Sequence, residues 1–107
     1  MRIVQLLLLV GLMLLPVRAS ALTLDHNGCI GLAIWHRDVL WARDVGADKA
    51  KVKASIQEMY RLEPHPVFTL LLRNFDSLWA TGMPGPAVME SVYKECVGRK
   101  GVYGDAT

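Results

Sequence analysis

Apolar residues recur at helical spacing in four stretches of the chain. The clearest stretch covers residues 49–62, whose apolar positions follow i, i+4, i+7 and i+8: Val52, Ile56, Met59 and Tyr60. Asp48 precedes this stretch and can cap its N-terminus, and Pro64 ends it because the residue before a proline avoids the helical region. The pattern therefore predicts an amphipathic helix from Lys49 to Leu62.

The first stretch runs from about Cys29 to Val45. Asp25 or Asn27 can cap its start, and Gly46 follows where a left-handed residue ends many helices. Apolar residues occupy both of its sides: Ile30, Ala33, Ile34, Trp41 and Val45 on one, and Leu32, Trp35 and Val39 on the other. So wide an apolar surface predicts a central helix, or a helix with a partner on its second face.

The third stretch starts at Pro66, which suits the first turn of a helix, and ends at Gly82. Its apolar positions are again helical: Phe68, Leu71, Leu72, Phe75 and Trp79. Residues 67–72 would also suit a buried strand. The length of the stretch and its continuing period favour a helix.

The fourth stretch follows a turn-rich linker, residues 83–86, and runs from Pro86 to Gly98. One of its faces is apolar: Met89, Val92, Tyr93 and Cys96. Residues 99–107 are rich in glycine and lack a pattern, so we expect a flexible C-terminal tail.

The N-terminal segment has the organisation of a secretory signal peptide. Arg2 precedes an apolar run over residues 3–17, and Ala19-Ser20-Ala21 forms a small-x-small cleavage site. We expect cleavage near Ala21, which leaves a helical domain over residues 22–98 and the tail. A retained membrane anchor is the alternative, but the run is shorter than the roughly 20 residues that span a bilayer. No stable membrane insertion is expected after cleavage.

Composition and charge narrow the classes of protein. The chain has 107 residues, of which 52% are hydrophobic, and its formal net charge is +2. This hydrophobicity excludes a disordered chain, and the length excludes a repeat array or a two-domain enzyme. Cleavage would remove Arg2 and Arg18 and leave a formally neutral protein. Nucleic acid is therefore not an expected partner.

Two cysteines, Cys29 and Cys96, lie near the two ends of the helical region. In an exported protein such a pair predicts one intramolecular disulfide, with free thiols or an intermolecular bridge as alternatives. In an up-down arrangement the start of the first helix and the end of the fourth lie at the same pole. The predicted disulfide and the predicted topology are therefore compatible. Together they predict an all-α fold, a small up-down bundle of about four helices closed by one disulfide.

Catalytic and metal-binding patterns are scarce. His36-Arg37-Asp38 matches the kinase catalytic-loop tripeptide, but no glycine-rich loop accompanies it, and we interpret the three as surface groups. No G-x-S-x-G, H-E-x-x-H or P-loop sequence occurs. His26, Cys29 and Cys96 are too few ligands for a zinc site. The sequence predicts neither an enzyme nor a bound metal or cofactor.

Aromatic and lysine residues remain as candidates for binding. Trp41 and Trp79 are expected in the core, whereas Trp35, on the other side of the first helix, is the candidate interface residue. Trp35→Ala should then weaken association and leave the melting temperature nearly unchanged. Three lysines start the second helix: Lys49, Lys51 and Lys53. They form either a solvated face or a small patch for an anionic partner.

The overall layout carries a resemblance. An early Cys29, the sequence Ala42-Arg43-Asp44-x-Gly46 at a helix end and a late Tyr93-x-x-Cys96 follow a signal peptide. The chain resembles small bacterial periplasmic one-disulfide helical proteins of unknown function. More loosely, it is similar to helical immunity proteins that neutralise secreted cell-wall amidases, and to small acid-stress chaperones. The resemblance implies a periplasmic or secreted helical protein and transfers no functional residue.

Together these observations predict an exported protein-binding module. An inhibitor, immunity or accessory factor of the cell envelope is the leading interpretation, with an envelope protein or a second copy of the chain as partner. A periplasmic stress chaperone is the alternative. A carrier of a small molecule, haem or metal is third, with Met59 and His65 as conceivable haem ligands.

Overall fold

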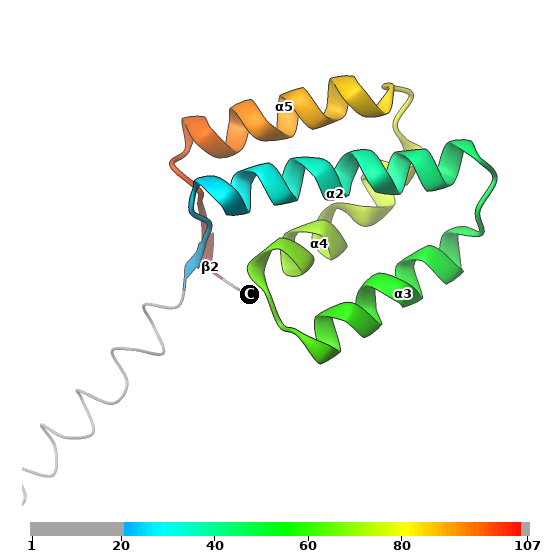
Figure 1. Cartoon of the computed structure of the whole chain (residues 1–107), viewed down its shortest axis with the longest axis horizontal. Helices are drawn as coiled ribbons and strands as arrows, with labels where there is room; N and C mark the ends of the chain where they lie inside the picture. Colours follow the sequence, from blue (N-terminus) through cyan, green and yellow to red (C-terminus); the bar gives the residue numbers. More distant parts are fainter. Residues whose placement is uncertain (1–20, 106–107) are drawn as a thin grey trace, which may run out of the picture.

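Within residues 21–105, which the computed structural model describes, four helices lie between two short strands (Figure 1). In chain order the elements are β1 (Ala21–Thr23), α2 (His26–Asp44), α3 (Lys49–Leu62), α4 (Pro66–Ala80), α5 (Gly85–Gly98) and β2 (Val102–Asp105). The predicted all-α bundle is confirmed, and α3 has the predicted bounds. The predicted signal peptide lies outside the described residues, apart from the backbone of Ala21.

Side-chain caps and a glycine set the helix ends. The Asp25 carboxylate accepts a hydrogen bond of 2.7 Å from the Gly28 amide and caps α2. Asp48 caps α3 in the same way, through a bond of 3.0 Å from the Lys51 amide. Gly46 follows α2 with φ of 89°, which is the left-handed conformation expected there.

Helix α2 is the centre of the bundle. It packs against α5 on one side and α4 on another, and α3 packs mainly against α4 (Figure 1). Short connections usually make successive helices neighbours, but α5 packs on α2 and hardly on α4. A cavity lies between α4 and α5, and polar residues of both helices line part of it: Asn74, Ser77 and Ser91.

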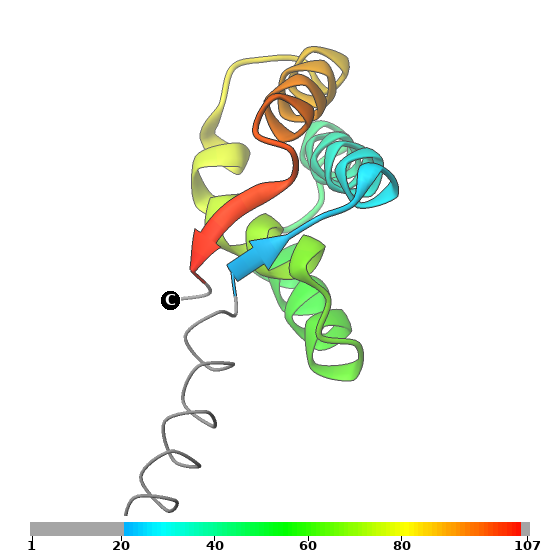
Figure 2. The same cartoon turned by 90° about the vertical axis from the view of Figure 1, so that its left-hand side faces the viewer.

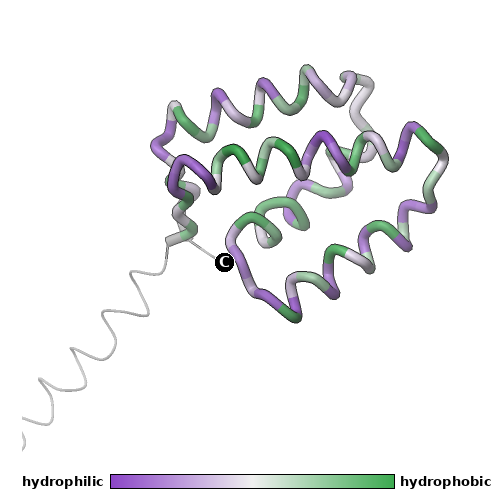
Figure 3. The backbone as a smooth tube through the Cα atoms, viewed as in Figure 1, coloured by the Kyte–Doolittle hydropathy of each residue, from purple (hydrophilic) through white to green (hydrophobic). Residues whose placement is uncertain are grey.

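Two apolar clusters fill the interior. The disulfide cluster lies where α2 begins and α5 ends: Leu22, Leu24, Cys29, Leu32, Val67, Leu70 and Cys96. The second, the central cluster, lies further along the helices: Val39, Leu40, Ile56, Leu71, Phe75, Leu78 and Val88. Hydrophilic and hydrophobic positions are mixed along α3 (Figure 3), and Ile56 is the residue of α3 that is buried. Truncating a fully buried residue such as Phe75 would cost about 3–5 kcal/mol.

The predicted disulfide between Cys29 and Cys96 is present. It joins the first turns of α2 to the last turn of α5, with the two Cα atoms 5.6 Å apart. Both cysteines are buried in the disulfide cluster. The bond therefore fixes the same end of the two helices that the up-down arrangement brings together.

Residues 102–105 are not part of a flexible tail, and that expectation is wrong for them. They form β2, which pairs antiparallel with β1 in the register Ala21↔Asp105 and Thr23↔Val102. The ribbon lies across one end of the bundle (Figure 2). Such short strands show no alternation in the sequence, and the partner strand is at the opposite end of the chain.

Gly101 allows this return of the chain. Its carbonyl accepts a 2.9 Å hydrogen bond from the Leu24 amide, and its own amide donates a 2.8 Å hydrogen bond to the Cys96 carbonyl. Gly101 has φ of 72°, and a Cβ atom there would lie 1.9 Å from the Leu24 carbonyl oxygen. A residue without a side chain is therefore required. The turn lets Tyr103 pack on the disulfide cluster.

Candidate functional site

An open groove separates α2 from α3. The two helices are joined by a short loop, but α3 packs against α4 and has few contacts with α2. The space between them has a volume of about 490 Å³. Its lining residues are mostly apolar: Trp35, Val39, Trp41, Ala42, Val52, Ile56 and Met59, with Asp38 and Ser55. We call this space the α2–α3 groove.

Helical spacing places these residues along the groove. On α2, positions 35, 38, 39 and 42 recur every three or four residues, so they share one face. On α3, positions 52, 55, 56 and 59 do the same. Each wall is therefore about two helical turns long, or about 11 Å. Val39 and Ile56 are buried at its base, so the groove opens directly onto the central cluster.

Trp41 stands on the rim of this groove. It was expected in the core, and that prediction is wrong, because 67% of the residue is exposed. The reason is its position close to the end of α2, where the chain turns away towards α3. Trp79, the second expected core tryptophan, is half-buried and stacks on Phe75 with ring centres 5.7 Å apart.

Trp35, the candidate interface residue, lies at the junction of the two apolar clusters. Its ring meets the edge of Phe68 with centres 5.4 Å apart. It is half-buried and still lines the α2–α3 groove. Replacing it by alanine would therefore lower the melting temperature, contrary to the expectation for a surface residue. Whether it binds a partner stays a prediction.

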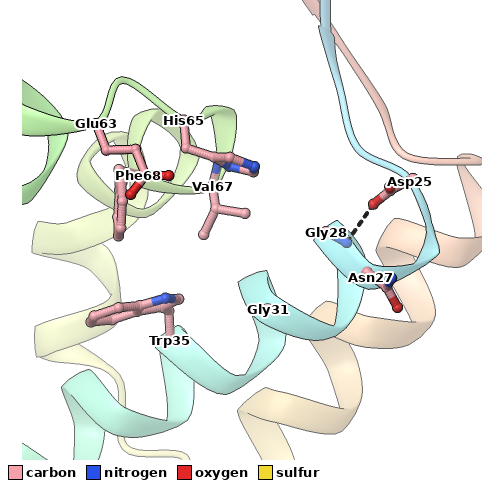
Figure 4. A pocket seen from close by; sticks show the side chains of 9 residues that line it. All are labelled: Asp25, Asn27, Gly28, Gly31, Trp35, Glu63, His65, Val67 and Phe68. Carbon is pink, nitrogen blue, oxygen red and sulfur yellow. Dashed lines mark hydrogen bonds between the residues drawn. The ribbon is translucent and has the colours of Figure 1, made fainter.

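Trp35 also lines a second cavity, of about 380 Å³, between the start of α2 and the corner joining α3 to α4 (Figure 4). Two of the polar side chains on its walls cap helices. Asp25 accepts from the Gly28 amide, and His65 Nδ1 accepts a 3.1 Å bond from the Val67 amide at the start of α4. Two carboxylates and two helix N-termini face this space, so it favours neither an anion nor a cation.

The predicted lysine patch is partly neutralised within the protein. Lys49 and Lys53 each lie 3.3 Å from the Asp76 carboxylate on α4. Their hydrogen bonds and charges lower the pKa of Asp76 below its ordinary value. Lys51 is exposed and makes no ion pair with the described part of the chain. The patch therefore offers less positive charge than the sequence indicates, and its binding role stays a prediction.

His36 is a buried polar group that the sequence analysis placed on the surface. It is 3% exposed, and its Nδ1 donates a 2.7 Å hydrogen bond to the Leu32 carbonyl. It lines a cavity of about 240 Å³ between α4 and α5. Burial lowers the pKa of His36, against smaller opposing effects of the Leu32 bond and of Glu95. Its spacing of four from both Leu32 and Leu40 was the available signal.

Among residues 21–105 no three His, Cys, Asp or Glu side chains come together as a metal site would require. No helix in that range combines the length and the apolar character needed to cross a membrane.

Comparisons with known proteins give no relative. No protein-family model matches the chain, and neither the curated proteins nor the solved structures compared with it include a significant match.

Proposed function

We propose that this chain is an exported protein-binding module that receives an apolar helix of a protein partner in the α2–α3 groove. The observation that carries the proposal is the groove itself, with two tryptophans and a methionine on its walls. Tryptophan is enriched among the residues that dominate binding energy, and methionine adapts to irregular apolar surfaces. An inhibitor, immunity or accessory factor of the cell envelope would work through such a surface.

The dimensions of the groove favour a helix as the occupant. Each wall presents residues at i, i+3 or i+4, and i+7, which is the spacing of apolar anchors on an amphipathic helix. Two turns of such a helix would fill its length of about 11 Å. Asp38 on the α2 wall already pairs with Arg37 at 3.2 Å, so the groove would hold its occupant mainly through apolar contacts.

Two features support export. The Cys29–Cys96 disulfide is of a kind that persists in oxidising compartments and is rare in the cytosol. The sequence before Ala21 has the organisation of a signal peptide.

The test is affinity capture of envelope proteins from the native host on the immobilised exported chain. Trp41→Ser removes the rim tryptophan, and Ser55→Glu places a charge in the α2–α3 groove without touching the core. Leu62→Ser and Ala54→Glu are matched controls, because both residues are exposed and lie outside the groove.

We expect one stoichiometric protein to be retained by the wild type and by both controls, with at least tenfold less retained by Trp41→Ser and Ser55→Glu. Recovery of no specific protein would overturn the proposal. Equal retention by Ser55→Glu and the wild type would show that the groove is not the binding surface.

A further inference from the structure

A second apolar surface lies between α2 and α5, where a groove of about 630 Å³ runs along the two helices. We define the α2–α5 face by six residues that line it: Ile30, Ile34 and Arg37 of α2, and Met89, Glu90 and Tyr93 of α5. Ile30 and Ile34 are each 37% exposed. None of these six residues lines the α2–α3 groove.

The α2–α5 face continues to the far end of α2. A neighbouring groove shares Arg37 and Pro86 with it and adds Trp41. The combined surface therefore reaches from Ile30 to Trp41, about 16 Å along the helix axis. It is apolar over most of this length, and charged residues interrupt it near its middle.

The two charged residues of the α2–α5 face have opposite signs, Arg37 on α2 and Glu90 on α5, and each is paired with an opposite charge on its own helix. On α2, Arg37 pairs with Asp38 at 3.2 Å. On α5, Glu90 pairs with Lys94 at 2.8 Å. All four side chains are substantially exposed. A surface with a cation on one half and an anion on the other is complementary to itself after a two-fold rotation.

Two contacts between α2 and α5 show which residues of the two helices lie at the same height along the helix axes. The disulfide joins positions 29 and 96, and Arg37 Nη1 lies 3.7 Å from Met89 Sδ. Residue 37 of α2 is therefore level with about residue 89 of α5. Glu90 lies one residue further, about 1.5 Å along the axis.

We propose that a second copy of this chain covers the α2–α5 face, with a two-fold axis parallel to the helices. This rotation lays α2 over α5 of the second copy, and Arg37 comes level with Glu90 of the second copy. The four charges then alternate in one row, from Asp38 through Arg37 to Glu90 and Lys94 of the second copy. Every neighbouring pair among the four helices runs antiparallel, as in many four-helix bundles.

The area indicates a reversible dimer. A face about 16 Å long and two helices wide, about 20 Å, covers roughly 300 Å². A standard interface buries about 800 Å² on each partner. The dimer is therefore expected to dissociate in the micromolar range. The ion pairs set the register, and the isoleucines and Trp41 supply the apolar contact.

The experiment is sedimentation velocity of the exported chain from about 1 to 200 µM. Arg37→Glu and Glu90→Arg each place like charges opposite one another, and the double variant restores the opposite signs. Arg61→Glu is the matched control, because Arg61 is an exposed ion-pair residue of α3 outside the face. Far-UV circular dichroism and the melting temperature establish that each variant is folded.

We expect a concentration-dependent dimer whose Kd rises at least tenfold in each single charge reversal. The double variant restores the attraction between positions 37 and 90 but places like charges beside Asp38 and Lys94, so its Kd should lie between those of the single variants and the wild type. Arg61→Glu should have the Kd of the wild type. Ile34→Asp should abolish the dimer. A monomer throughout the range, a Kd that Ile34→Asp leaves unchanged, or a double variant as weak as the singles would each overturn the proposal.

Separate variants test the dimer and the binding of an envelope protein. Ser55→Glu lies in the α2–α3 groove and should leave the dimer unchanged. Arg37→Glu lies on the α2–α5 face and should leave capture of an envelope protein unchanged.

Discussion

Reduction of the Cys29–Cys96 disulfide should remove a large part of the stability of this protein. The two cysteines are 67 residues apart in the sequence, so the bond closes a loop that includes all four described helices. The loss of chain entropy in the unfolded state for a loop of this length corresponds to about 4 kcal/mol. Small domains have total stabilities of about 5–15 kcal/mol, and one this short lies near the lower limit.

Reduction isolates this effect better than substitution does. Both sulfur atoms stay in the disulfide cluster when the bond is broken, so packing changes little. The double variant Cys29→Ala/Cys96→Ala also loses buried atoms, and it should lose about 1–2 kcal/mol more than the reduced wild type. The difference between the two measures packing alone.

The assay is equilibrium unfolding in urea, followed by tryptophan fluorescence and by circular dichroism, with and without reductant. Thiol titration must show two thiols after reduction and none before. We expect the free energy of unfolding to fall by about 4 kcal/mol on reduction. A fall of less than about 1 kcal/mol, with both thiols titrated, would refute the reasoning from loop entropy.

Three further predictions concern a buried histidine and two glycines. Burial lowers the pKa of His36 below the unfolded value of 6.5, so the unfolded state takes up a proton first as the pH falls. The contribution of His36 to the free energy of unfolding should be constant above pH 6.5 and should fall by up to about 1.4 kcal/mol per pH unit below it. This slope should be lost in His36→Gln and kept in His26→Gln, which changes an exposed histidine. Gly31→Ala should stabilise α2 by about 0.5–1 kcal/mol in urea unfolding, since a Cβ there meets nothing within 4 Å. Gly101→Ala should destabilise by at least about 2 kcal/mol, because its φ is positive and the Leu24 backbone occupies the space; a stable variant would contradict the geometry of this turn.

The helices and their caps could be predicted from sequence because the signals are local. Apolar residues three and four apart mark one helix face, and Asp48 and Gly46 sit where the chain starts or ends a helix. The disulfide could be predicted from two cysteines in a chain whose N-terminal sequence predicts export. Short connections make consecutive helices antiparallel, and this arrangement brings the two cysteines to the same end of the bundle.

The sequence could not show which apolar residues are buried, because burial depends on which helix packs against which face. Trp41 fits the apolar pattern of α2 as well as Leu40 does, yet Trp41 is largely exposed while Leu40 is fully buried. Whether a residue near the end of α2 is covered depends on the course of α3 and α5 beyond it. His36 shows the converse, because a polar residue is buried between helices whose approach no local pattern specifies. β2 was missed because its partner strand is about 80 residues away in the chain.

The position of Trp41 links the two proposed surfaces. It lines the α2–α3 groove on one side of α2 and the end of the groove towards α5 on the other. Trp41→Ser should therefore weaken both capture of an envelope protein and formation of the dimer. Ser55→Glu should affect capture alone, and Arg37→Glu the dimer alone. If Trp41→Ser weakens one association and leaves the other at its wild-type strength, the residue contributes to that surface only, and the other surface must end before it reaches Trp41.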